Sequence, residues 1–311
     1  MRVAALDLGS NTFLCLICEV VSTASTTAGQ GPSSQKIRTI YSDQIEIVRL
    51  GQGLSTSKKF HPEALSRAKA CLENFKKTID THRPDRILAM ATSAARDAEN
   101  QNELFKICKD LEIPLEIIPG HKEAEITYQG AISGQKTSDQ KKLILDIGGG
   151  STEFIFGQAD HILNATSVNI GCVRLTEKYI LNQPTTAADI QICRKFIIES
   201  LLQIPNHEPK QILAVAGTPT TLAAVELGAF LPEKIEGYEL TLPQLEAWLQ
   251  RLQPLSVQEK IQLGFPAGRA DVILVGVLIL IESLKNFNLT KIIISTRGVR
   301  HGVALEIADR N

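Results

Sequence analysis

The sequence predicts an α/β protein built from two similar domains that face each other across a cleft. Strand and helix signals alternate along the whole chain, which is typical of α/β folds. The length of 311 residues suits two domains. The segment VAALDLGSNTFL at 3–14 also recurs in pattern as LILDIGGGSTEF at 143–154. In each copy an apolar run leads through an Asp and a Gly into a second apolar run, which indicates an internal duplication.

The expected elements follow the chain in order. Residues 2–8 and 13–21 are predicted as strands around a turn at 9–12, and the Ser/Thr/Gly-rich segment 22–36 as a flexible loop. Further strands are expected near 39–49 and at 86–91, 115–118, 142–147, 153–157 and 291–295. Helices are expected at 62–81, 102–111, from 120 onward, and at 172–181, 187–202, 218–227, 243–252, 268–286 and 299–309.

Composition restricts the classes of partner. The chain is 43% hydrophobic and 22% charged with a formal net charge of −1, so no overall charge attracts it to nucleic acid or to a membrane. The most apolar run, VILVGVLILI at 272–281, is too short to cross a bilayer and is expected to be a buried helix. The opening residues do not resemble a signal peptide. An anionic ligand would have to be held locally.

The six cysteines are dispersed without the spacing of a disulfide framework. Cys15 and Cys18 form a CxxC pattern, but they lie in an alternating strand, where an offset of three places them on opposite faces. We therefore expect reduced cysteines and a cytoplasmic protein.

The first copy of the repeat places an acidic side chain before a glycine turn. Asp7 is followed by a glycine and three polar residues: Gly9, Ser10, Asn11 and Thr12. Glycine lets a ligand approach the backbone, and exposed N–H groups in such a turn bind anions. The pattern favours a phosphate-binding turn, with a plain hairpin turn as the alternative.

The second copy has three consecutive glycines. Asp146 is followed by Gly148, Gly149, Gly150, Ser151, Thr152 and Glu153. Three glycines in a row are costly to order, whereas a plain turn needs only one or two. This segment therefore favours a phosphate-binding loop.

Carboxylates beside a phosphate would repel it unless a cation lay between them. Mg²⁺ prefers oxygen ligands and retains several waters, so Asp7, Asp146 and Glu153 predict a magnesium site. A solvated or helix-capping carboxylate is the alternative for each.

Two weaker signals point to the same chemistry. In VAGTPTTLAA at 215–224, a strand runs into Gly217 and Thr218 before a helix, and a helix N-terminus of this kind binds anions. It is equally an ordinary strand–helix turn. Arg96 follows a buried strand, where its guanidinium would clamp phosphate or form a surface ion pair.

Taken together, these segments resemble the Ppx/GppA family of exopolyphosphatases and guanosine pentaphosphate phosphohydrolases. The matching segments run in order over nearly the whole chain: DLGSNT at 7–12, ATSAARDA at 91–98, IIPGHKEAEITYQG at 117–130, LDIGGGSTEF at 145–154, GCVRLTEKY at 171–179, VAGTPTTLAA at 215–224, GRADVILVGVLIL at 268–280 and STRGVRHGV at 295–303.

The resemblance implies two ribonuclease H-like domains of the sugar kinase, heat-shock-70 and actin superfamily, with the active site in the interdomain cleft. We expect the domains at 1–120 and 121–298, with the last helix, about 299–311, packing on the first domain. Family members of this length have only the two catalytic domains.

The resemblance also implies roles for individual residues. Glu123 matches the second glutamate of the family's Gly-x-Glu-Glu-Ala element, the expected general base, although a glutamate at a helix start also favours the helix dipole. Asp146 and Glu153 match acidic positions associated with metal and catalysis, and Arg96 matches the arginine of a Thr-x-x-x-Arg element. The first loop (Asp7, Ser10, Asn11) and the phosphate loop (148–152) match as well.

Two positions depart from the family pattern. Lys122 replaces the first glutamate of the Gly-x-Glu-Glu-Ala element. The closing motif reads Arg300-His301-Gly302 where the family usually has Arg-Glu-Gly. No acidic or nucleophilic partner is identifiable for His301, so we expect it to be a helix-start residue.

The function expected from these features is release of terminal orthophosphate from inorganic polyphosphate by Mg²⁺-assisted attack of water. The closest alternative is hydrolysis of guanosine pentaphosphate (pppGpp) to the tetraphosphate. An ATP-using enzyme of the same superfamily and a non-catalytic sensor of alarmone or nucleotide are further alternatives. We expect no nucleic-acid or membrane partner, and a homodimer is an open alternative to a monomer.

Overall fold

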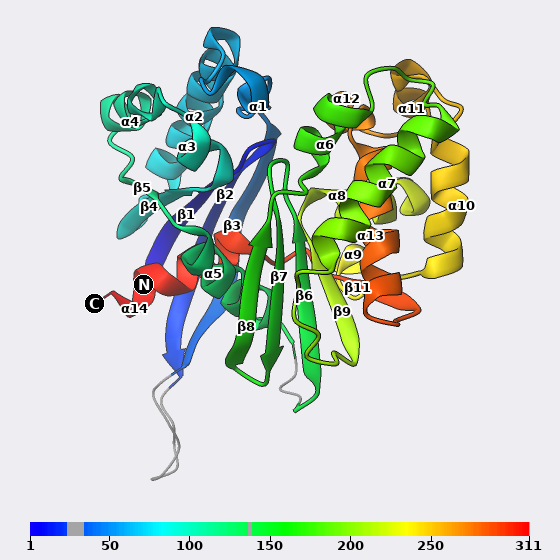
Figure 1. The fold of residues 1–311 in the computed structure, drawn as a ribbon. Helices are drawn as coiled ribbons and strands as arrows, with labels where there is room; N and C mark the ends of the chain where they lie inside the picture. The colour runs from blue at the N-terminus through cyan, green and yellow to red at the C-terminus, as the bar shows by residue number, and fades with distance from the viewer. Residues whose placement is uncertain (24–33, 136–138, 311) are drawn as a thin grey trace. The chain divides into compact units, whose positions relative to one another are not determined.

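The computed structural model describes residues 1–23, 34–135 and 139–310. The chain folds into two compact units, one of Met1–Gln135 with Arg297–Asn311 and one of Lys136–Thr296 (Figure 1). The sequence prediction placed the domain boundary at residue 120. In the structure, the helix that begins there packs against the C-terminal helix and belongs with the first unit.

The first unit contains a five-stranded sheet in the order β3-β2-β1-β4-β5. Its strands are β1 (Arg2–Leu8), β2 (Thr12–Thr23), β3 (Ser34–Ile47), β4 (Arg86–Ala91) and β5 (Leu115–Ile117). The first three strands are antiparallel, and β1, β4 and β5 run parallel. Its helices are α1 (Leu54–Ser57), α2 (Pro62–His82), α3 (Ser93–Asp97), α4 (Gln101–Asp110), α5 (Gly120–Ile132) and α14 (Val299–Asp309).

Helices cover both faces of this sheet. On β1, Ala4 and Leu6 belong to a core with α2 and α4, while Val3 and Ala5 belong to a core with α5 and α14. A strand buried on both faces reads as a continuous apolar run, and β1 has that pattern. Its C-terminal end carries Asp7, so the sheet positions that carboxylate.

Helices α5 and α14 cross with their backbones in contact. A Cβ at Gly130 would overlap the carbonyl oxygen of Gly298, and a Cβ at Gly302 would overlap the carbonyl oxygen of Ile126. Only glycine permits so close an approach. This crossing holds the C-terminal helix against the helix that carries Glu123.

The second unit contains a six-stranded sheet in the order β10-β11-β9-β6-β7-β8. Its strands are β6 (Lys141–Ile147), β7 (Thr152–Gln158), β8 (His161–Val168), β9 (Gln211–Val215), β10 (Glu239–Thr241) and β11 (Lys291–Ile294). Strands β6, β7 and β8 are antiparallel, whereas β6, β9 and β11 run parallel.

The helices of this unit share one core with alternate residues of the sheet, such as Leu143, Leu145 and Ile147 of β6. The helices are α6 (Cys172–Tyr179), α7 (Ala187–Leu201), α8 (Gly217–Leu227), α9 (Pro232–Ile235), α10 (Leu242–Leu252), α11 (Val257–Gln262), α12 (Ala267–Ala270) and α13 (Ile273–Asn286). All residues from Ile273 to Leu284 are buried, which confirms the predicted buried helix.

The two sheets repeat one plan. Three antiparallel strands are followed by parallel strands added beyond the first of them: β3-β2-β1-β4-β5 corresponds to β8-β7-β6-β9-β11. The repeated Asp-x-Gly pattern falls at the same place in both, with the Asp at the end of the first strand (β1 or β6) and the Gly in the turn that follows. The predicted fold class, two ribonuclease H-like α/β domains, is therefore confirmed.

Three expected elements differ in the structure. The predicted helix 268–286 is interrupted, because Val272 N–H bonds the carbonyl of Arg269 and the chain turns there between α12 and α13. The turn at 92–96 contains the short helix α3. Strands β8 and β10 and the short helices α1, α9 and α11 were not predicted. Strands β2 and β3 take the ends of the expected loop 22–36, and most of that loop lies outside the described residues.

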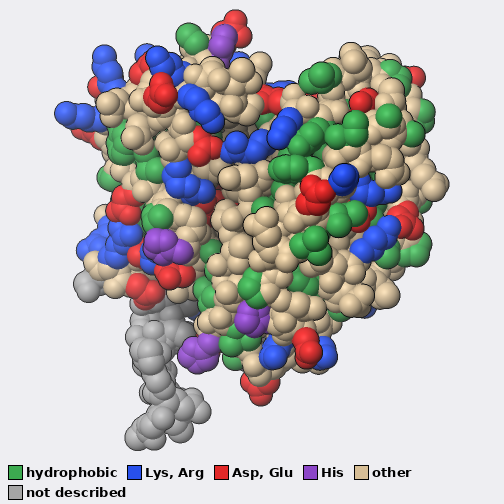
Figure 2. Space-filling model, viewed as in Figure 1, with side chains coloured by type: hydrophobic (Ala, Val, Ile, Leu, Met, Phe, Trp, Pro, Cys, Tyr) green, Lys and Arg blue, Asp and Glu red, His purple; other side chains and the backbone are tan. Residues whose placement is uncertain are grey.

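The mixed surface charge and the buried cysteines agree with the expectations from the sequence. Figure 2 shows acidic and basic side chains interspersed on the drawn face. No helix among the described residues is long and apolar enough to span a bilayer. Cys15 and Cys18 lie in the cores on opposite faces of the sheet, as predicted, and burial raises the pKa of each thiol to about 12.

The close crossing of α5 and α14 predicts a large effect of one methyl group. Gly302→Ala should destabilise the protein by about 3 kcal/mol, the upper end of overpacking costs, because the new Cβ meets rigid backbone at Ile126. Chemical denaturation measures the change. Gly134→Ala is the matched control, since the atoms nearest to its Cβ would belong to the flexible side chain of Arg297. Equal stability of the two variants would contradict the rigid crossing.

Candidate active site

The two glycine turns close in the same way. Gly9 N–H donates to the carbonyl of Thr12 at 3.1 Å, and Gly148 N–H donates to the carbonyl of Ser151 at 3.0 Å. Each turn follows an aspartate at the end of a buried strand, Asp7 in one unit and Asp146 in the other. The repeat in the sequence is thus a repeat of backbone geometry.

The carbonyl groups of the triple-glycine loop are bonded to the start of α6. Gly148 O accepts from Cys172 N at 3.0 Å, and Gly149 O accepts from Val173 N at 3.0 Å. Gly150 O accepts from Arg174 Nε at 2.8 Å. In a planar peptide the N–H points opposite to the carbonyl, so the N–H groups that follow these carbonyls are directed away from α6. Successive N–H groups displayed in this way form an anion-binding nest.

Gly171, immediately before α6, makes this arrangement possible. A Cβ at this position would overlap the backbone of Gly149 and Gly150. The loop backbone therefore rests directly on the residue that precedes the helix. Thr152, the last residue of the predicted loop, begins β7, and its hydroxyl donates to the carbonyl of Ile170 at 2.9 Å. This hydrogen bond fixes the end of the loop to the segment that precedes α6.

The first turn is supported by the segment after β3. The carbonyl of Asn11 accepts from Val48 N at 3.0 Å and from Arg49 N at 2.9 Å. The carbonyl of Ser10 accepts from Gly51 N at 2.8 Å. The predicted site residues of this turn are nearly buried: Asp7 at 8%, Ser10 at 7% and Asn11 at 9% exposure. Thr12 begins β2.

The two acids of the second unit are cross-strand neighbours. Asp146 of β6 is paired in register with Glu153 of β7. Glu153 is 1% exposed, and its Oε1 accepts hydrogen bonds from the hydroxyls of Ser151 and Ser167, both at 2.7 Å. Like charges directly opposite each other destabilise a sheet, so a cation near this pair would relieve the repulsion.

This donor set is compatible with Mg²⁺. No three His, Cys, Asp or Glu side chains converge into a metal cage within the part of the chain that the structure describes. Mg²⁺ is commonly held by only one or two carboxylates, with water and phosphate oxygens completing its shell. Asp146 and Glu153 supply that number within one unit, while Asp7 belongs to the other unit.

The turn at Gly217 contains a cation that the sequence reasoning missed. A Cβ at Gly217 would overlap the guanidinium of Arg269, whose Nη1 donates to Thr221 Oγ1 at 2.9 Å. Burial lowers the pKa of Arg269. The sequence prediction uses the GRADVILVG segment at 268–276 only as part of the family resemblance and assigns no role to its arginine. Thr218 packs its side chain against Gly276 of α13, which leaves the backbone at the start of α8 as the part suited to an anion.

In the first unit, the structure brings Arg96 and Glu123 together. Arg96 Nη1 donates to Glu123 Oε2 at 2.7 Å and to the carbonyl of Ile118 at 2.9 Å. Glu123 is 6% exposed in the first turn of α5. Burial raises the pKa of its carboxyl, and the neighbouring Arg96 opposes that shift. A buried carboxylate with an elevated pKa suits proton abstraction near neutral pH.

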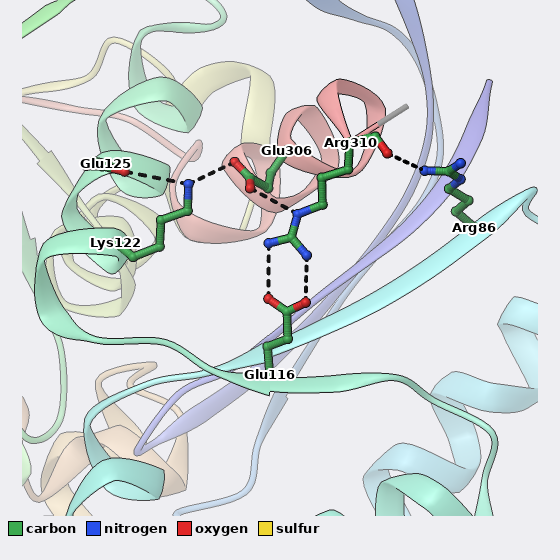
Figure 3. Close-up of polar contacts among 6 residues, drawn as sticks. All are labelled: Arg86, Glu116, Lys122, Glu125, Glu306 and Arg310. Atoms are coloured by element: carbon green, nitrogen blue, oxygen red, sulfur yellow. Dashed lines mark hydrogen bonds and ion pairs between the residues drawn. The ribbon is translucent and has the colours of Figure 1, made fainter.

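Lys122, the departure beside Glu123, directs its charge toward the C-terminal helix. Its Nζ lies 3.1 Å from Glu306 and 3.6 Å from Glu125 (Figure 3). Arg310 bonds both Glu306 and Glu116, and the Arg310 carbonyl accepts from Arg86 (Figure 3). Lys122 therefore links α5 to α14 through ion pairs. A glutamate at position 122 would instead place its carboxylate near those of Glu125 and Glu306.

Arg300 and His301 of the closing motif lie in different surroundings. Arg300 forms a two-pronged ion pair with Asp43 of β3, at 2.7 and 2.8 Å. His301 lies in the first turn of α14, as expected, and is 2% exposed. Burial, together with Arg300 and Arg297, holds the pKa of His301 well below its ordinary 6.5, so the imidazole is neutral.

Comparison with known proteins identifies the class. Residues 31–311 match the model of the Ppx/GppA phosphatase family. Exopolyphosphatase 2 of Mycobacterium tuberculosis is 30% identical over 99% of this chain and 98% of that protein. The guanosine-5'-triphosphate,3'-diphosphate pyrophosphatase of Photobacterium profundum is also 30% identical, over 99% of this chain and 59% of that longer protein.

A solved structure shows the same fold. The crystal structure of an exopolyphosphatase from Cytophaga hutchinsonii superposes with a TM-score of 0.86, covering 100% of this chain and 98% of that chain at 27% identity. The chain belongs to the Ppx/GppA phosphatase family. Its fold and its family's phosphohydrolase chemistry follow from this membership.

The neutral, buried His301 predicts acid sensitivity. An unfolded chain takes up a proton on this histidine below about pH 6.5, whereas the folded chain does not, so folding stability should fall as pH falls. At about pH 5.5 the loss should be about 1 kcal/mol relative to about pH 8. Denaturation of wild type and His301→Gln at both pH values measures it. The same pH-dependent loss in both proteins would contradict this role of His301.

Proposed function

We propose that this protein is an exopolyphosphatase that releases terminal orthophosphate from inorganic polyphosphate by attack of water. The observation that carries the proposal is the triple-glycine loop, whose three carbonyls bond α6 and whose following N–H groups face away from it. Such a row of donors suits the three non-bridging oxygens of a terminal phosphoryl group. The exopolyphosphatases of M. tuberculosis and C. hutchinsonii support this choice of substrate.

In the proposed reaction, Glu123 accepts a proton from the attacking water. The water oxygen bonds the terminal phosphorus as the bridging P–O bond breaks, and the shortened polyphosphate leaves with the bridging oxygen. Arg96 orients Glu123 through Nη1 and presents the rest of its guanidinium to phosphate oxygens. Arg269, beside Gly217, adds a second cation for the substrate.

Mg²⁺ bound by Asp146 and Glu153 would neutralise charge on the phosphoryl oxygens. Asp146 and Glu153 hold their side chains on adjacent strands, in register. Ser10, Asn11 and the backbone of the first turn are further proposed donors to phosphate oxygens.

A second candidate substrate is pppGpp, which carries the same terminal phosphoanhydride. The P. profundum relative, named for guanosine-5'-triphosphate,3'-diphosphate, favours it. The chemistry at the phosphoryl group is the same for both, so substrate competition decides between them. Phosphate release from short-chain polyphosphate, long-chain polyphosphate, pppGpp and ATP should be compared side by side. Release from pppGpp alone would replace polyphosphate as the proposed substrate.

The base is tested by Glu123→Gln. Loss of the proton acceptor should lower kcat by about 100-fold or more while the fold is retained, because general-base catalysis contributes about that much. Glu125→Gln is the matched control, since Glu125 lies two residues further along α5 and its side chain is 50% exposed. Its kcat should stay near that of wild type. Activity of Glu123→Gln within several-fold of wild type would remove Glu123 from this role.

Metal removal is a separate test. Phosphate release should stop when the protein is dialysed against EDTA and return when Mg²⁺ is added, because Mg²⁺ held by the two cross-strand carboxylates would neutralise charge on the phosphoryl oxygens. Asp146→Asn should raise the Mg²⁺ concentration needed for half-maximal activity. Full activity in EDTA would contradict the metal assignment.

A further inference from the structure

Three polar residues lie in one row across the sheet of the second unit. Asp146 of β6 is in register with Glu153 of β7, and Glu153 is in register with Ser167 of β8. Directly paired residues project from the same face of a sheet. Ser167 therefore stands next to Glu153 on the side opposite to Asp146, on the edge strand of the sheet.

Two hydroxyls bond one oxygen of the Glu153 carboxylate. Ser151 Oγ and Ser167 Oγ both donate to Oε1 at 2.7 Å. The terminal torsion of a glutamate is broad, so the carboxylate plane is free to turn unless hydrogen bonds hold it. Ser151 is two residues away along the chain, whereas Ser167 arrives from another strand. The pair thus fixes Glu153 from two directions.

We infer that Ser167 is a positioning residue, which holds the Glu153 carboxylate in the orientation needed at the phosphate loop. This rests on the proposed function, in which Glu153 binds Mg²⁺ beside the transferring phosphoryl group. Ser167 itself touches neither the loop glycines nor Asp146 through any hydrogen bond described in the structure. Its effect is transmitted through one bond to Glu153.

The preceding residue of β8 provides a matched control. Thr166 projects from the opposite face of the sheet, and its hydroxyl donates to Asn164 at 3.1 Å. Thr166→Ala removes a γ-methyl as well as a hydroxyl from a half-buried position, so it disturbs the strand at least as much as Ser167→Ala. Only removal of the Ser167 hydroxyl withdraws a donor from Glu153.

The experiment compares wild type, Ser167→Ala, Ser167→Thr and Thr166→Ala in two assays. The first is Mn²⁺ binding by electron paramagnetic resonance, which requires no turnover. The second is phosphate release from polyphosphate as a function of substrate and of Mg²⁺. Thermal unfolding of each variant accompanies both assays.

For Ser167→Ala we expect Mn²⁺ affinity and kcat each to fall by about tenfold, as for loss of one hydrogen bond to a charged group, with KM for polyphosphate within about twofold. Ser167→Thr keeps the hydroxyl and a strand-compatible side chain, so it should restore both. Thr166→Ala should match wild type. Mn²⁺ affinity unchanged in Ser167→Ala would overturn the inference, as would losses equal to those of Thr166→Ala. Absence of phosphate release by wild type would instead count against the proposed function and leave the Mn²⁺ comparison to decide on Ser167.

Discussion

The candidate site of the second unit depends on one set of hydrogen bonds, those between the carbonyls of Gly148–Gly150 and the start of α6. Backbone groups buried without partners are costly, so three successive carbonyls turned inward require three donors behind them. The free N–H groups at a helix N-terminus supply most of these donors. Gly171 lets the two backbones touch. Once the carbonyls are bound on this side, the opposite side of the loop must display N–H groups, and the proposed phosphate binding relies on this peptide geometry.

The first unit reaches a related arrangement by different means. Its turn is held by the segment after β3 instead of a helix, and the proposed base, Glu123, lies on α5. Two kinds of contact hold α5 against α14. The glycines at the crossing bring the two backbones together, and Lys122 forms ion pairs through its side chain. The backbone contact matters more, because partly exposed ion pairs contribute little to stability.

Two opposing effects act on the pKa of the Glu123 carboxyl. Burial favours the neutral acid, whereas Arg96 at 2.7 Å favours the carboxylate. A buried carboxylate without a partner would be strongly destabilising, and one paired too well would be a poor base. Arg96 is predicted as a site residue from its position after a buried strand, but that prediction does not include its contact with Glu123. Sequence spacing alone does not show that residues 96 and 123 meet.

The sequence by itself determined the α/β class, the duplication, most helices and strands, and both glycine turns, because these depend on local patterns of apolar residues, glycine and aspartate. It also singled out Asp146 and Glu153 as acids beside a glycine loop, and Glu123 through motif resemblance. Only the tertiary structure decided the contacts of Arg269 with Gly217 and of Ser167 with Glu153. It likewise decided that α5 belongs with α14. These contacts join residues far apart in the chain, and their partners are set by strand register and backbone packing, which leave no periodic signal in the sequence.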